Sequence, residues 1–184
     1  MLKPACPVSA FITTGGRLNV MFDNFSMRAR QVVFVARFKA GERGARTIEV
    51  DDLLAALVLE DQGMSEEIFS SSFGDRDTFV NRTPSHLPFF SSETAEHLLA
   101  RIKDILPQSD SVGMIEEIPL SPALNNVVGS AIAIQTQFQR SQIEPLLLLA
   151  AIVSQPSSEC TELLNEFGIT QEGVLAKLRG TADN

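Results

Sequence analysis

The side chains that most often do chemistry in proteins are sparse in this sequence and poorly placed to act together. The two histidines are His86 and His97, and Glu93 lies one helical turn before His97. These residues could supply two metal ligands, but a metal site needs a third ligand at a suitable spacing, and the sequence shows none. We therefore expect no metal ion and no cofactor.

Neither nucleophilic nor acid–base catalysis has a recognisable set of residues. Cys160 has no histidine near it in the sequence, and a cysteine in a short amphipathic helix is more often a small buried apolar group than a nucleophile. No serine lies in a G-x-S-x-G turn. The acidic pairs Glu66–Glu67 and Glu116–Glu117 are adjacent, so their side chains do not share a helix face. The sequence predicts no catalytic residue and a protein that is not an enzyme.

Two neighbouring acids, Asp51 and Asp52, stand in the first turn of a predicted helix within the phrase "IEVDDLLAALV". They could recognise a cation together, or they could offset the helix dipole and cap free backbone amides. The second interpretation is favoured because acids are common at this helix position. A nearly identical phrase, "IEPLLLLAAIV", occurs later in the chain and has Leu146 and Leu147 at the same two places.

Composition narrows the class of protein. The chain has 184 residues, of which 44% are hydrophobic and 21% charged, and its formal net charge is −8. No apolar run approaches the roughly 20 residues that span a bilayer. An acidic chain is also a poor ligand for phosphates, so we expect neither a membrane nor a nucleic acid as partner. Cys6 and Cys160 fit no disulfide framework, which indicates reduced thiols and a cytoplasmic protein.

Hydrophobic periodicity predicts helices along most of the chain, and no segment alternates as a strand would. Ser26 and Ser92 are the expected N-caps of two helices, and Pro107 is expected to end the second of them. The helices predicted in the first copy and the connector span residues 26–41, 49–61, 65–73 and 92–106. The expected fold class is all-α.

The sequence repeats itself at an offset of 95 residues without a gap. The matched residues fall on the apolar faces of the predicted helices, and they include Ser26 on Ser121, Val32 and Val33 on Val127 and Val128, Ile48 on Ile143, and Leu53 to Ala56 on Leu148 to Ala151. We expect two pseudo-symmetric repeats of three to four helices, packed as one domain. The predicted segments are an N-terminal extension (1–20), a double-repeat domain (21–179) with repeat one at about 25–75, a connector with an extra helix (76–117) and repeat two at about 118–179, and a tail (180–184).

Three phrases carry a family resemblance: "FSMRARQVVFVA" opening a helix, "IEVDDLLA" opening the next, and "IPLSPALNNVV" opening the second copy. Together they resemble the N-terminal repeat domain, or Clp R domain, of Clp-type AAA+ unfoldases such as ClpA and ClpC, over about residues 21–179. The chain contains no G-x-x-x-x-G-K-[ST] loop for nucleotide phosphates. The resemblance therefore implies a Clp N-domain-like protein that stands alone, without the ATPase modules.

The resemblance also implies candidate site residues. In some members of the family each repeat binds phosphoarginine, with a hydroxyl at the start of the first helix on the phosphate and a carboxylate on the guanidinium. The corresponding residues are Ser26 and Asp51 in the first copy, and Ser121 and Leu146 in the second. A leucine cannot pair with a guanidinium, so the resemblance implies phosphoarginine binding at the first repeat only.

The function implied is that of a non-enzymatic module that binds proteins or peptides through a groove between its copies. Its partner would be a Clp unfoldase, an adaptor or a substrate, and it would act as an accessory or regulator of chaperone-linked, Clp-dependent proteolysis. The alternative is a structural or regulatory scaffold that has kept the fold and lost the ligand pockets. The apolar stretch "LPFF" at 87–90 is either a strap buried against the core, which is favoured, or an exposed docking patch.

Overall fold

A computed structural model describes residues 22–64, 89–107, 118–156 and 158–180, and every regular element in these ranges is a helix. The all-α expectation is therefore confirmed, while the helix predicted at 65–73 lies outside the described residues. The helices are α3 (Met27–Glu42), α4 (Val50–Asp61), α6 (Ser92–Ile105), α7 (Pro122–Gln137), α8 (Pro145–Val153), α9 (Glu159–Glu166) and α10 (Gln171–Gly180).

Serine hydroxyls begin four of these helices. Each hydroxyl accepts a hydrogen bond from the backbone N–H three residues later, at 3.1 to 3.2 Å, and the four are Ser26, Ser91, Ser121 and Ser158. The predicted cap at Ser92 is wrong by one residue, because Ser91 holds that position. The second helix of each unit begins differently: α4 has a capping box between Glu49 and Asp52, and α8 has Pro145 in its first turn.

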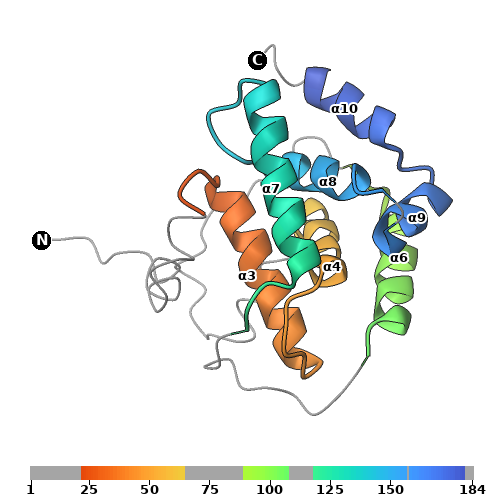
Figure 1. Ribbon diagram of the computed structural model, residues 1–184. Coiled ribbons are helices and arrows are strands. Elements are labelled where there is room, and N and C mark those ends of the chain that lie inside the picture. The colour runs from red at the N-terminus through yellow and green to blue at the C-terminus, as the bar shows by residue number, and fades with distance from the viewer. Residues whose placement is uncertain (1–21, 65–88, 108–117, 157, 181–184) are drawn as a thin grey trace, which may run out of the picture.

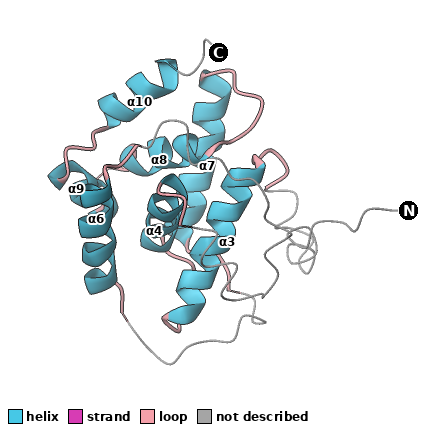
Figure 2. Cartoon of the chain, turned by 180° about the vertical axis from the view of Figure 1, so that it is seen from behind, coloured by secondary structure: helices cyan, strands magenta, loops and turns pink. Residues whose placement is uncertain are grey.

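The two long helices α3 and α7 lie side by side on one face of the molecule, with α4 and α8 behind them (Figure 1). The view from behind shows α6 and α9 beside α4, on the side away from α3, and α10 along α8 (Figure 2). Helix α3 packs mainly on α4, and α7 packs mainly on α8. Buried apolar residues from all seven described helices form a single core, so the two units share one domain as expected.

Backbone hydrogen bonds join the two units in a reciprocal way. The N–H of Ser26 donates to the carbonyl of Ile143 at 3.0 Å, and the N–H of Ile143 donates to the carbonyl of Asn24 at 2.7 Å. The equivalent pair of bonds, shifted by 95 residues, is Ser121 N–H to Ile48 carbonyl at 3.0 Å and Ile48 N–H to Pro119 carbonyl at 2.8 Å. The start of α3 is therefore bonded to the segment just before α8, and the start of α7 to the segment just before α4. This exchange relates the two units by a pseudo-twofold axis.

The helix predicted in the connector packs as part of the first unit. Helix α6 lies on α4, as α10 lies on α8 in the second unit. Helix α10 was not predicted as a separate element from the sequence. These contacts give each unit an outer helix that covers the buried second helix.

The described part of "LPFF" is held against the core. The Phe90 side chain is 4% exposed, and Phe89 is half-buried beneath the Nζ atom of Lys177, 4.7 Å from its ring centre. The carboxylate of Asp61 accepts the backbone N–H groups of Phe89 at 2.8 Å and of Phe90 at 2.9 Å. The buried-strap interpretation is confirmed for these two residues.

Candidate docking surfaces

The two candidate serines are structural caps in the fold. The hydroxyl of Ser26 accepts from the N–H of Ala29 at 3.2 Å and is partly buried. Ser121 does the same for its own helix and is only 4% exposed. Because the backbone pairing crosses between units, Ser121 lies beside Ile48, three residues before Asp51, whereas Ser26 lies beside Ile143. The first turn of α4, which carries Asp51, therefore begins near Ser121, the N-cap of α7 in the second unit, and not near Ser26.

The carboxylate of Asp51 is engaged by the second unit. It stands in the first turn of α4 and accepts a hydrogen bond from the Sγ atom of Cys160 on α9, at 3.1 Å. Burial raises the pKa of Asp51 above its ordinary value, although the bond from Cys160 opposes this. Burial, together with the neighbouring carboxylate, also raises the pKa of the Cys160 thiol. The thiol therefore stays protonated and acts as a donor, as a buried cysteine should.

Asp52 makes a different set of contacts from its neighbour. Its side chain is fully buried and binds Arg43 through two hydrogen bonds of 2.9 and 2.6 Å, while accepting the backbone N–H of Glu49 at 2.8 Å. The bond to Asp52 raises the pKa of the Arg43 guanidinium. Asp51 and Asp52 are therefore not a joint cation site. No local sequence pattern predicts the pairing of Arg43 with Asp52. The comparison of the two copies does mark it, because the corresponding residues of the second unit are Phe138 and Leu147.

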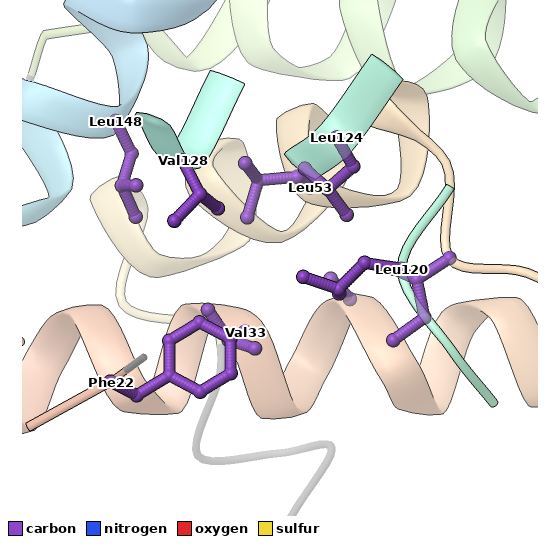
Figure 3. A pocket seen from close by; sticks show the side chains of 9 residues that line it. Phe22, Val33, Leu53, Leu120, Leu124, Val128 and Leu148 are labelled. Carbon is purple, nitrogen blue, oxygen red and sulfur yellow. The ribbon is translucent and has the colours of Figure 1, made fainter. Parts of the chain in front are cut away.

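A small hollow lies between α3 and α7, where the repeats meet (Figure 3). Its walls are entirely apolar and include two pairs related by the offset, Val33 with Val128 and Leu53 with Leu148. The hollow has a volume of about 10 Å³, roughly one water molecule. The expected groove between the copies is thus closed at this point, because side chains from both units fill it.

A larger cleft opens within the first unit, where α3 ends beside α4 and α6. We call it the α3–α4–α6 cleft, and it encloses about 400 Å³, within the range of ligand pockets. Its lining residues are Lys39, Glu42 and Arg43 from the end of α3, Asp52, Ala55 and Leu59 from α4, and Leu99, Ile102, Lys103 and Leu106 from α6 and its cap. Sequence reasoning missed this cleft because its walls come together only when α6 packs on α4.

Charge distinguishes the two units along their first helices. The segment from α3 through the following turn carries the basic residues Arg28, Arg30, Arg37, Lys39, Arg43 and Arg46. At an offset of 95 residues each of these falls on an uncharged residue of the second unit: Ala123, Asn125, Ile132, Ile134, Phe138 and Ser141. The first unit therefore has six basic residues in this segment, whereas the corresponding segment of the second unit has Arg140 alone.

The sequence model of the Clp repeat (R) N-terminal domain matches residues 24–167. The chain belongs to this family. As a Clp N-domain it has the general character of a protein-docking module, and docking domains of this kind carry no catalytic centre. Comparison with the sequences of curated proteins gave no match.

Solved structures of similar fold agree with this assignment. One is the N-terminal domain of the caseinolytic protease associated chaperone ClpD from Arabidopsis thaliana, with 16% identity, a TM-score of 0.61, and coverage of 89% of this chain and 97% of that one. Another is a chain from structural investigations of a malarial protein secretion system, with 14% identity, a TM-score of 0.63, and coverage of 87% and 95%. At these identities the likeness concerns the fold alone.

The described residues hold neither a membrane-spanning helix nor a cluster of metal ligands. No described helix is long and apolar enough to cross a membrane. Within the same residues, no three His, Cys, Asp or Glu side chains are grouped so that they could hold a metal ion.

Proposed function

We propose that this Clp N-domain is a non-enzymatic docking module that receives a protein or peptide segment and acts as a cytoplasmic accessory or regulator of Clp-dependent proteolysis. The observation that supports it most is the α3–α4–α6 cleft, which combines an apolar floor with a charged rim. Protein-binding sites have this anatomy, because the apolar centre supplies affinity and the polar rim supplies orientation.

The test is a degradation assay with a purified Clp-type unfoldase and its peptidase, acting on a fluorescent model substrate. Added in increasing amounts, the protein should change the rate of degradation and should co-elute with the unfoldase or with a substrate. A rate unaffected at every concentration, with no complex on gel filtration, would refute the proposal. The matched control is the protein with the cleft filled by Ala55→Leu, which should have a smaller effect at equal concentration.

A scaffold that has lost its ligand pockets is the second candidate. It is favoured by the engagement of Asp51 with Cys160 and by the burial of Ser121, since both leave the carried-over positions occupied within the chain. Light scattering after gel filtration separates the two functions. A defined oligomer that binds neither unfoldase nor substrate would support the scaffold and contradict the docking module.

Phosphoarginine binding at the first repeat stays a prediction, and the contacts define what it would require. The carboxylate of Asp51 would have to exchange its hydrogen bond from Cys160 for one from a guanidinium. The hydroxyl of Ser26 would have to turn from the N–H of Ala29 towards the phosphate. Calorimetric titration with free phosphoarginine tests this directly. Binding that disappears in Asp51→Ala would establish the site, and absence of heat at millimolar ligand would dismiss it.

A further inference from the structure

We propose that the α3–α4–α6 cleft binds an acidic peptide segment, with one bulky apolar side chain in the cleft and carboxylates at its rim. This inference rests on the proposed docking function and names the chemistry of the partner. It concerns a site of the first unit, distinct from the carried-over positions Ser26, Asp51 and Ser121.

The floor of the cleft selects an apolar side chain. Ala55 and Leu59 on α4 face Leu99, Ile102 and Leu106 around the same space. Ala55 is the small residue in this set, so the space next to it is available to an incoming side chain. Burying a leucine-sized group in such a space removes apolar surface from water, which is the main source of affinity at protein interfaces.

The rim selects negative charge. Glu42 and Asp52, the two acids of the cleft, are already bonded within the chain, Glu42 by Lys39 at 2.8 Å and Asp52 by Arg43. Lys103 is exposed on the opposite wall. Of the charged side chains that line the cleft, Lys39, Arg43 and Lys103 are basic and only Glu42 and Asp52 are acidic. The side chains of the rim therefore carry a net positive charge, although the chain as a whole carries −8.

The second unit lacks the matching chemistry. At an offset of 95 residues, Arg43 and Asp52 become Phe138 and Leu147, and Lys39 becomes Ile134. The two basic residues and the acid that pairs with Arg43 are thus replaced by three apolar residues in the second unit. The site should exist once in each chain, so the expected stoichiometry is one peptide per protein.

The experiment uses a fluorescent peptide with one leucine flanked on both sides by glutamates, acetylated and amidated at its ends. Its counterparts carry glutamine or lysine in place of glutamate. Fluorescence anisotropy should show saturable one-to-one binding of the glutamate peptide, weakening as salt is added because exposed charges are screened. The glutamine peptide should bind more weakly and the lysine peptide should not bind.

Charge reversal provides the matched pair of variants. Lys103→Glu should weaken binding by about fivefold, the scale of an exposed ion pair. Arg179→Glu makes the same change of charge in the last turn of α10, away from the cleft, and should leave binding unchanged. Equal weakening by the two variants, or equal binding of the glutamate and glutamine peptides, would overturn the proposal.

Filling the cleft tests the apolar half. Ala55→Leu should abolish binding, with thermal melting to verify the fold. If that variant is unstable, Leu99→Gln removes apolar lining at a half-buried position and should also weaken binding. Binding of decanoate without any peptide would identify a lipid site and overturn the proposal. A protein that alters Clp-dependent degradation but ignores the peptide would refute this inference alone, and the reverse result would refute only the proposed function.

Discussion

The thiol of Cys160 donates a hydrogen bond to the carboxylate of Asp51 at 3.1 Å, although the two residues lie 109 positions apart in the chain. The bond joins α9 of the second unit to the first turn of α4 in the first unit. A position that the family resemblance assigns to a ligand thus serves as an internal contact between units.

Asp51→Asn should alter the pH dependence of stability. Burial raises the pKa of Asp51, so the folded chain holds this proton more tightly than the unfolded chain. Its contribution to stability is fully present below the ordinary pKa of 3.8 and is lost as the pH rises through the raised value. Asparagine keeps an oxygen acceptor for Cys160 and carries no charge. The variant should therefore gain stability relative to the wild type as the pH rises towards neutrality.

Urea unfolding at a series of pH values measures this difference. The exposed Asp104→Asn removes the same charge at a surface position and is the control. A difference for Asp51→Asn that does not change with pH would show that the desolvated charge has no role.

Arg43 and Asp52 should be replaceable together but not singly. Arg43→Phe leaves a fully buried carboxylate without its cation, and Asp52→Leu leaves a buried guanidinium without its anion, each costing about 3–5 kcal/mol. The double variant copies the Phe138 and Leu147 of the second unit and should lie only about 1 kcal/mol below the wild type, the cost of the lost cap on Glu49. Chemical unfolding of the four proteins in a double-mutant cycle gives these values. Additive losses would contradict the prediction.

Asp61 should be needed to hold the start of α6. Its carboxylate accepts the N–H groups of both Phe89 and Phe90, so Asp61→Ala leaves two backbone donors without this acceptor and should cost about 1–3 kcal/mol. Asp61→Asn retains one acceptor oxygen and should cost less. Thermal unfolding ranks the variants, and hydrogen exchange should show faster exchange at Phe90 in the alanine variant. Equal stability of the two variants would argue against the hydrogen bonds.

Two glycine substitutions should have opposite signs. A Cβ atom at either Gly129 or Gly168 would meet nothing within 4 Å, but Gly168 has a φ of +73° whereas Gly129 lies inside helix α7. Gly129→Ala should stabilise the protein by about 0.5–1 kcal/mol because alanine has the higher helix propensity. Gly168→Ala should destabilise it by about 1–2 kcal/mol, since left-handed backbone is unfavourable for a residue with a Cβ atom. Melting temperatures of the two variants on opposite sides of the wild type would confirm both.

The helices follow from local patterns, which is why the sequence predicts them well. The predicted ends of α3 and α4 agree with the structure to within one or two residues, because Ser26 and the apolar periodicity are local signals. Contacts between distant residues have no such signal. Two such contacts are the backbone hydrogen bond from Ser26 to Ile143, which joins the units, and the ion pair of Arg43 with Asp52. Both depend on how the helices pack. The α3–α4–α6 cleft was missed for the same reason.

The reciprocal backbone pairing at Ser26 and Ser121 has the isologous form of a contact between the two chains of a twofold dimer. In a dimer of single units such a contact would depend on protein concentration, and it would be lost on dilution. Fusing the copies into one chain makes it intramolecular and independent of concentration. It also frees the two halves from identical sequence, so one unit can carry a charged cleft while the other has the apolar residues Ile134, Phe138 and Leu147 at the corresponding positions.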